Sequence, residues 1–206
     1  MNRLFGMRTY LVGAMDRVED GGVEWREQLE PELNKLGVVV FNPCNKAIPI
    51  ADESEDSRNR RQKYKNAGAY NSAVEEMKEI RNVDLRMVDI SDFIIANIDL
   101  DVHACGTYEE IVTANRQKKP IIVRMKQGKS NTPDWLLGMM GSSHNMIFHT
   151  WEEIIDYLKD INECSESSIR SLNHHGRWVF FDLHSLYDKV LNGVSYSDTK
   201  KTKTKT

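Results

Sequence analysis

The 206-residue sequence lacks any apolar run long enough to cross a membrane. Its longest apolar runs, at 37–41 and 93–96, are far shorter than the roughly 20 residues that a membrane-spanning helix needs. The N-terminal segment Met1 to Arg8 has neither the apolar core nor the cleavage site of a secretory signal. We therefore expect a cytoplasmic protein that has no membrane partner.

Cysteine is also scarce, and the cysteines that are present do not pair by spacing. Cys44, Cys105 and Cys164 lie far apart, with no CxxC or HxxxH pattern in the chain. A disulfide framework and a zinc site both require closer or more regular spacing. We expect reduced thiols, no metal and no cofactor.

An excess of positive charge is missing as well. The formal net charge is -3, from 28 basic and 31 acidic residues. This balance argues against a nucleic-acid partner. We predict that the Lys/Thr-rich end of the chain, residues 197–206, is a solvated, disordered tail.

Hydrophobic residues make up 40% of the chain, which is enough for a folded domain with a substantial core. We predict this domain at residues 1–162.

Apolar, strand-like segments alternate with amphipathic, helix-like segments up to about residue 162. The sequence predicts strands at 8–12, 38–42, 93–98, 119–124 and 145–148, and helices at 23–36, from 74 to Ser91, at 107–117 and at 151–158. A short turn of helix is expected near Trp135, and Thr150 is predicted to cap the last helix. This alternation indicates an α/β fold, Rossmann-like (flavodoxin-like), with a five-stranded parallel sheet and helices on both faces.

Two segments do not fit the alternation. Residues 45–73 contain a highly charged stretch, 52–61, and few apolar residues, so we predict a long surface insertion or lid there. Residues 163–196 are predicted to form an amphipathic C-terminal extension with Trp178, Phe180 and Phe181. The sequence leaves open whether this extension docks on the domain or on a neighbouring subunit.

Ionisable side chains crowd the stretch 99–114, which joins the predicted strand 93–98 to the next helix. They are Asp99, Asp101, His103, Glu109 and Glu110. In a parallel α/β sheet this junction lies at the carboxyl end of a strand, where ligands bind. A further acid, Asp84, is predicted on the preceding helix. Paired carboxylates suit a reaction in which one attacks or stabilises an electron-poor carbon and the other protonates the leaving group, as in cleavage of a glycosidic bond.

Several motifs, taken in order, resemble the nucleoside 2-deoxyribosyltransferase family, which includes the related deoxynucleoside 5′-monophosphate N-glycosidases. The resemblance spans roughly residues 8 to 160. The motifs are Tyr10-Leu-Val-Gly-Ala-Met15, Trp25-Arg26, Asn42-Pro43, Asp84 with Asp92 eight residues later, and Gly106-Thr-Tyr-Glu-Glu-Ile-Val-Thr-Ala114 followed by Lys119-Pro-Ile-Ile.

The resemblance implies distinct roles for the acids. Glu110, four residues before Ala114, matches the nucleophile that attacks C1′ of the sugar and forms a covalent glycosyl ester. Asp84 matches the carboxylate that contacts the base and protonates it as it leaves. Asp101 is the nearest match to the acid that binds the sugar hydroxyls, but position 104, where many relatives have that acid, is Ala. Asp99, Asp101 and His103 therefore all remain candidates for this role.

The resemblance also implies which other residues bind the substrate. The sugar and base pocket would be lined by Tyr10, Gly13, Ala14, Met15, Gly106 and Thr107. Arg26 is either a pocket residue or a surface ion-pair partner, and we predict that Cys105 and Glu109 belong to the scaffold. A late polar contact would come from Asn131, Ser142 or Asn145, and a 5′-phosphate would be bound by Arg124 or by the segment 141–143.

From these roles we expect cleavage of the N-glycosidic bond of a 2′-deoxynucleoside, with transfer of the deoxyribosyl group to another nucleobase. One alternative is hydrolysis of (deoxy)nucleoside 5′-monophosphates. An alternative of another class is a nucleotide-binding module without catalysis. The expected partners are a (deoxy)nucleoside or nucleotide and a free nucleobase. The resemblance implies a homo-oligomer, a dimer or larger.

Overall fold

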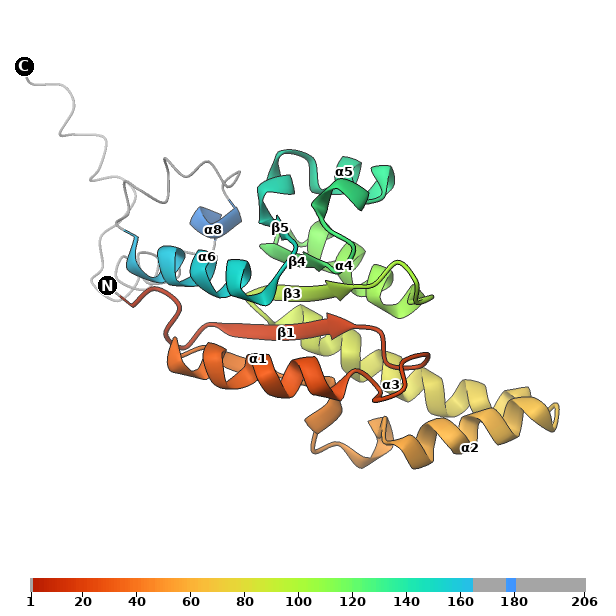
Figure 1. Ribbon diagram of the computed structural model, residues 1–206. Coiled ribbons are helices and arrows are strands. Elements are labelled where there is room, and N and C mark those ends of the chain that lie inside the picture. The colour runs from red at the N-terminus through yellow and green to blue at the C-terminus, as the bar shows by residue number, and fades with distance from the viewer. Residues whose placement is uncertain (1, 165–176, 181–206) are drawn as a thin grey trace, which may run out of the picture.

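The computed structural model describes residues 2–164 and 177–180, and a parallel sheet lies at its centre (Figure 1). Each strand pairs with its neighbours in parallel, in the order β2-β1-β3-β4-β5. The strands are β1 (Arg8–Gly13), β2 (Val39–Phe41), β3 (Phe93–Ile98), β4 (Ile121–Met125) and β5 (Ile147–Phe148). This order is flavodoxin-like and confirms the predicted fold class. In it the direction of winding reverses between β1 and β3, and ligands of such sheets bind outside the carboxyl ends of the strands at this point.

Helices cover both faces of the sheet (Figure 1). One face carries α1 (Val23–Lys35) and α6 (Trp151–Glu163), and the other carries α3 (Tyr70–Ile90), α4 (Cys105–Arg116) and α5 (Asp134–Met140). Successive side chains of a strand point to opposite faces, so Leu11 packs among residues of α1 and α6, whereas Tyr10 and Val12 pack among residues of α3 and α4. The face to which Tyr10 points is therefore the face that carries α3 and α4.

The predicted cap of α6 is present. The side chain of Thr150 accepts a hydrogen bond from the backbone N–H of Glu153, and the Glu153 side chain bonds back to the backbone of Thr150. The helix predicted near Trp135 is α5. Between residues 2 and 164 the short elements also include the 3₁₀ turns η1 (Pro43–Asn45), η2 (Pro49–Ala51), η3 (Lys129–Asn131) and η4 (Gly141–Met146).

The segment 45–73, predicted as a surface insertion or lid, is largely helical. It contains η2, the helix α2 (Glu55–Asn66) and the first turn of α3, which begins at Tyr70 and not at Val74 as predicted. Ser54 caps α2, with acids in its first turn and lysines in its last. This charge order stabilises a helix through its dipole, so the charges that suggested an irregular surface segment favour α2 instead.

The described part of the C-terminal extension docks on the domain, which answers the question that the sequence left open for it. Trp178 of α8 (Arg177–Phe180) is buried, lies 5.3 Å from the ring of Phe93 and donates a hydrogen bond to the Tyr157 hydroxyl. Arg177 donates to the carbonyl of Lys119 and to the side chain of Asn115. Phe181 and the predicted tail 197–206 lie outside the described residues.

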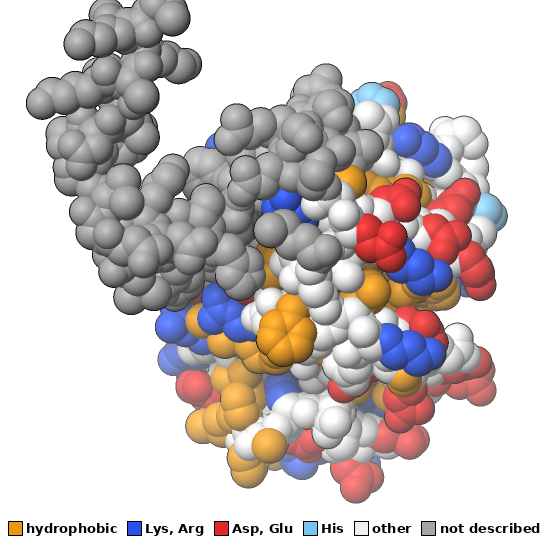
Figure 2. All heavy atoms as spheres, turned by 90° about the vertical axis from the view of Figure 1, so that its left-hand side faces the viewer, with side chains coloured by type: hydrophobic (Ala, Val, Ile, Leu, Met, Phe, Trp, Pro, Cys, Tyr) orange, Lys and Arg blue, Asp and Glu red, His pale blue; other side chains and the backbone are white. Residues whose placement is uncertain are grey.

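Figure 2 shows the end of the molecule at which the strands begin. There, Lys and Arg side chains are interspersed with Asp and Glu side chains over the described surface. The candidate residues of the strand-to-helix junctions belong to the other end of the sheet. Within 2–164 and 177–180, no helix is long and apolar enough to span a membrane.

Candidate active site

A buried tyrosine and a glutamate meet between β1 and α4. The Tyr10 hydroxyl donates a hydrogen bond of 2.9 Å to Oε1 of Glu110, which joins two positions 100 residues apart in the chain. Tyr10 is 2% exposed. Glu110 adjoins Ile111 and lies near Ala114, both fully buried, so α4 turns it toward the sheet. The residue that the resemblance identifies as a nucleophile is thus held by a residue predicted to line the pocket.

The neighbouring acid Glu109 lies on the outer side of α4. It forms an ion pair with Arg81 of α3, and the two side chains are 41% and 52% exposed, respectively. The hydrogen bond from Arg81 lowers the pKa of Glu109 below its ordinary value. Glu109 is therefore an ionised surface residue, as the prediction of a scaffold role requires.

Asp84, Glu53 and Lys46 form a second cluster of charged residues, the Asp84 cluster, whose carboxylates act on Tyr10 and Glu110 through their charge. Nζ of Lys46 lies 2.6 Å from Oδ1 of Asp84 on α3 and 2.5 Å from Oε1 of Glu53. All three side chains are buried, with 4% of Lys46, 12% of Asp84 and 10% of Glu53 exposed. Sequence reasoning identified Asp84 but missed Lys46 and Glu53, and no motif marks them. Both belong to the segment 45–73, which looked like an exposed insertion.

The charges of these groups act on one another. Burial raises the pKa of Glu110 to about 8, with a further contribution from the charge of Asp84, while the hydrogen bond from Tyr10 and the charge of Arg26 oppose the shift. Burial also raises the pKa of Asp84 to about 7, together with the charge of Glu53, against the opposing effect of Lys46. Burial and the same carboxylates raise the pKa of Tyr10 well above 10.

These shifts define the protonation of the site at neutral pH. Tyr10 remains a hydroxyl and can donate. Burial, together with the charges of neighbouring carboxylates, keeps protons on Asp84 and Glu110 near pH 7 that exposed carboxylates would have lost. A pair in which one group is ionised and the other protonated can supply both a nucleophile and an acid.

Arg26 shapes the end of β1, and the suggestion that it is a surface ion-pair partner was wrong. Its side chain is fully buried and donates to three backbone carbonyls, at 3.2, 2.7 and 3.0 Å, and its guanidinium lies 4.4 Å from the centre of the Trp25 ring. The carbonyls belong to Leu11, Gly22 and Gly13. Arg26 therefore ties the polar loop before α1 to the turn that begins at Gly13.

Close packing explains the two glycines of this region. A Cβ on Gly13 would lie 2.9 Å from Cζ2 of Trp25. Gly22 has φ +73°, a left-handed conformation that favours glycine, and a Cβ there would lie 2.5 Å from the carbonyl oxygen of Ala14. The partly buried turn residues Ala14 and Met15 follow Gly13 directly. This turn is therefore defined by backbone packing against Trp25 and Arg26.

The three candidates for binding the sugar lie after β3, and their contacts lead away from Glu110. Asp99 accepts hydrogen bonds of 2.6 Å from Lys126 and 2.6 Å from Gln127, and Asp101 accepts one of 3.1 Å from Gln127. Burial alone would raise the pKa of Asp99, but the bonds from Lys126 and Gln127 outweigh it and hold that pKa low. His103 is exposed. Among the residues described, no hydrogen bond or ion pair joins any of the three to Glu110.

The start of α4 is open to solvent. Cys105 and Gly106 are exposed, and a Cβ on Gly106 would meet nothing within 4 Å. The neighbouring Thr107 is buried. Packing inside the chain thus does not require glycine at 106, and there is free space beside this residue.

Among the described residues, no hydrogen bond or ion pair joins the remaining polar candidates to Tyr10 or Glu110. Asn131 donates to the carbonyl of Gln127, and both Ser142 and Asn145 are exposed. Arg124 donates to Oδ1 of Asn97 at 3.0 Å and lies 5.0 Å from the centre of the Trp151 ring on α6. Arg124 therefore points to the face that carries α1 and α6, opposite Glu110.

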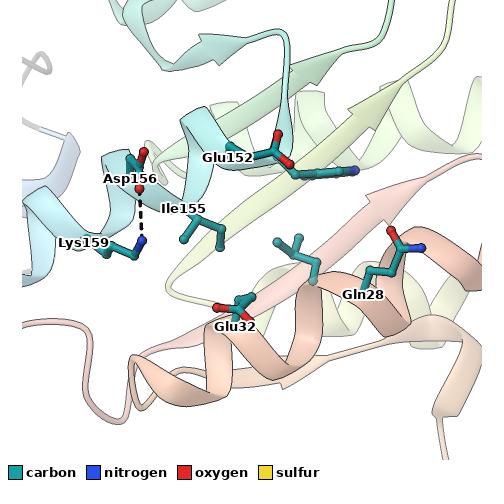
Figure 3. Close-up of a pocket in the computed structure, with 8 residues that line it drawn as sticks. Gln28, Glu32, Glu152, Ile155, Asp156 and Lys159 are labelled. Atoms are coloured by element: carbon teal, nitrogen blue, oxygen red, sulfur yellow. Dashed lines mark hydrogen bonds and ion pairs between the residues drawn. The ribbon is translucent and has the colours of Figure 1, made fainter.

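A pocket of about 380 Å³ lies between α1 and α6 (Figure 3). The close-up shows residues of both helices around it, among them Glu32 and Ile155, with Lys159 bonded to Asp156. Since α1 and α6 cover the face of the sheet opposite Tyr10 and Glu110, this pocket is not part of the candidate site.

In the described part of the chain, no group of three or more His, Cys, Asp or Glu residues could hold a metal ion.

Comparisons with known proteins give similarities at the level of solved structures. No family model matches the chain, and no curated protein matches its sequence. A 2-deoxyribosyltransferase from Bacillus psychrosaccharolyticus is 16% identical, with a TM-score of 0.49 over 78% of this chain and 94% of that chain. A 2-desoxiribosyltransferase from Leishmania mexicana is 18% identical, with a TM-score of 0.46 over 74% of this chain and 97% of that chain. Identities and TM-scores of this size assign no activity.

Proposed function

We propose that the protein cleaves the N-glycosidic bond of 2′-deoxynucleosides and transfers the deoxyribosyl group to another nucleobase. The observation that supports this most is the carboxyl group of Glu110, hydrogen-bonded to the Tyr10 hydroxyl, together with the buried carboxyl group of Asp84, whose charge acts on both. Buried carboxyl groups that repel each other reduce stability, so their presence together favours a chemical role over a purely structural one. The resemblance of the motifs around them specifies the substrate class.

In the first half-reaction, ionised Glu110 attacks C1′ of the sugar. The C1′–O bond to the carboxylate forms while the C1′–N bond breaks, and the proton of Asp84 passes to the departing base. Tyr10 donates to one carboxylate oxygen of Glu110, which leaves the other oxygen for the attack. In the second half-reaction a nitrogen of the incoming base attacks C1′, Asp84 takes up the proton of that base, and Glu110 is released. Attack by water in place of the base would give hydrolysis.

Product analysis tests the proposal. Purified protein is incubated with 2′-deoxynucleosides, or with their 5′-monophosphates, with and without a free acceptor base, and the products are separated by chromatography. We expect a new deoxynucleoside only when the acceptor is present, and a mass increase equal to one deoxyribosyl group on the intact protein. Base release that does not depend on the acceptor would assign hydrolysis instead. Absence of base release from every substrate would overturn both versions of the enzyme and leave the binding module.

The reaction should depend on pH in a bell-shaped manner. It requires Glu110 ionised and Asp84 protonated, and the pKa of Asp84 is raised to about 7 and that of Glu110 to about 8. In the free protein the single proton of the pair therefore lies mainly on Glu110, and the reactive form is the minor one in which that proton lies on Asp84. We expect kcat/KM to rise as the first proton leaves near pH 7 and to fall as the second leaves near pH 8. The two limbs belong to the pair and not to single residues. Activity that is already maximal at pH 5 would contradict a pair with raised pKa values.

A further inference from the structure

Lys46 has two carboxylates as partners inside the protein. Its ammonium group contacts Asp84 of α3 and Glu53, which directly precedes the cap of α2, and its side chain is only 4% exposed. The positive charge of Lys46 and the two carboxyl groups of Asp84 and Glu53 therefore lie together where little water reaches them. Two ionised carboxylates around a single ammonium would leave an unbalanced buried charge, which is unfavourable unless one of them holds a proton.

The chain positions these groups by well-defined local structure. Asn42 accepts a hydrogen bond from the backbone N–H of Cys44 and starts η1, which ends directly before Lys46. Arg58 of α2 donates a bond of 2.8 Å to the carbonyl of Glu53. The same guanidinium packs on Gly21, where an added Cβ would lie 2.5 Å from Nη1 of Arg58. The backbone that carries Glu53 is thus fixed against the loop before α1.

The two partners act on Asp84 in opposite directions. The charge of Glu53 raises the pKa of Asp84, and the charge and hydrogen bond of Lys46 lower it. Tyr10 of β1 and Glu110 of α4 also face this group, and the charges of Asp84 and Glu110 influence one another. Arg26 acts on Glu110 from the side of α1. Lys46 contacts both Asp84 and Glu53, and so joins the two carboxyl groups.

We propose that Lys46 and Glu53 are positioning residues for the reaction: Lys46 holds the carboxyl groups of Asp84 and Glu53 together, and the negative charge of Glu53 keeps on Asp84 the proton that Asp84 gives to the leaving base. The proposal rests on the proposed function. Neither residue needs to touch the substrate. When Asp84 gives up its proton, Lys46 balances the carboxylate that remains, and the proton returns from the incoming base in the second half-reaction.

Two single variants with opposite expected effects test this in the full-length protein. Lys46→Met removes the positive charge at similar volume, so the titration of Asp84 should move to higher pH by about one unit or more. Glu53→Gln removes the second carboxylate and should move the titration to lower pH by about one unit. The readout is the pH dependence of the ¹³C chemical shift of the Asp84 carboxyl group, assigned with an Asp84→Asn variant. The pH profile of kcat/KM for base release should move in the same directions.

Two further variants protect the test against simple misfolding. Lys46→Arg keeps the charge and should restore a profile close to that of the wild type. The double variant Lys46→Met/Glu53→Gln removes one positive and one negative charge together, so the titration should return toward its original position, and so should stability if Lys46→Met alone is poorly folded. A matched surface control is Lys78→Met, because Lys78 is exposed and lies 3.9 Å from exposed Glu75.

The outcomes separate this proposal from the proposed function. Opposite shifts of the Asp84 titration, reversed in the double variant, support the positioning role. If neither variant moves the titration, or both move it in the same direction, the proposal is overturned even when the wild type transfers deoxyribose. If the wild type releases no base, the proposed function fails. In that case the titration shows only that Lys46 and Glu53 change the pKa of Asp84, and their proposed role in the reaction is overturned together with the proposed function.

Discussion

Replacement of Glu110 by Gln is expected to abolish base release while it makes the protein more stable. The variant keeps the shape of the side chain and an oxygen that can accept from the Tyr10 hydroxyl. It removes the carboxylate that forms the ester, and loss of a covalent nucleophile lowers the rate by about 10³-fold or more. The measurement is base release under saturating deoxynucleoside, together with binding of the substrate by calorimetry, which should persist.

The stability gain follows from the sign of the pKa shift. In the folded protein burial raises the pKa of Glu110 to about 8, well above its ordinary value. The folded state therefore binds a proton more tightly than the unfolded chain does, and stability is lost as the pH rises from the unfolded pKa to the folded pKa. Because Gln cannot ionise, the Glu110→Gln variant does not lose this stability as the pH rises. We expect Glu110→Gln to be more stable than the wild type by roughly 1–3 kcal/mol at pH 8 and about equal to it at pH 4.

Glu109→Gln is the matched control. The residue is adjacent, has the same chemistry and is paired with Arg81 at the surface. Its replacement should leave base release unchanged and alter the free energy of unfolding by no more than about 0.5 kcal/mol. Equal losses of activity in the two variants would remove the distinction between the acids. Full activity of Glu110→Gln would rule out the covalent mechanism.

Most of the fold could be predicted because it depends on patterns that are local in the sequence. The apolar runs of β1 and β3 and the helical spacing of α1 and α4 are visible without any tertiary contact. The helix α2 was missed because its stability depends on a cap and on the order of its charges, and its apolar content is very low. A pattern search that looks for hydrophobic periodicity does not recognise such a helix.

The candidate site could be predicted only in part. Glu110, Asp84 and Tyr10 were identified because motifs of the resemblance mark them. Lys46 and Glu53 could not be identified from the sequence. They precede Asp84 by 38 and 31 positions, and they meet it only because the segment that carries them folds back on α3. A charged side chain in a polar segment is usually exposed, and the sequence contains no signal that these two are buried.

Arg26→Met is expected to destabilise the protein and to loosen the turn after β1. Met keeps the length of the apolar stem, so the effect measures the lost guanidinium and not an empty cavity. The carbonyls of Gly13 and Gly22 lose a charged donor in a region from which water is excluded. Each such loss costs about 1–3 kcal/mol, so we expect the free energy of unfolding to fall by roughly 2–4 kcal/mol in urea titrations.

The control for Arg26 is Arg86→Met, because Arg86 is exposed and lies 4.0 Å from an exposed Asp89. Its replacement should change stability by no more than about 0.5 kcal/mol, and a similar value for Arg26→Met would show that the backbone bonds contribute little.

Arg26 also lowers the pKa of Glu110 by its charge. Without it, ionised Glu110 is less favoured, so the pH profile of base release in Arg26→Met should move to higher pH. A residue that only supported the turn would change the rate and leave the profile in place, so this shift distinguishes an electrostatic contribution of Arg26 from a purely structural one.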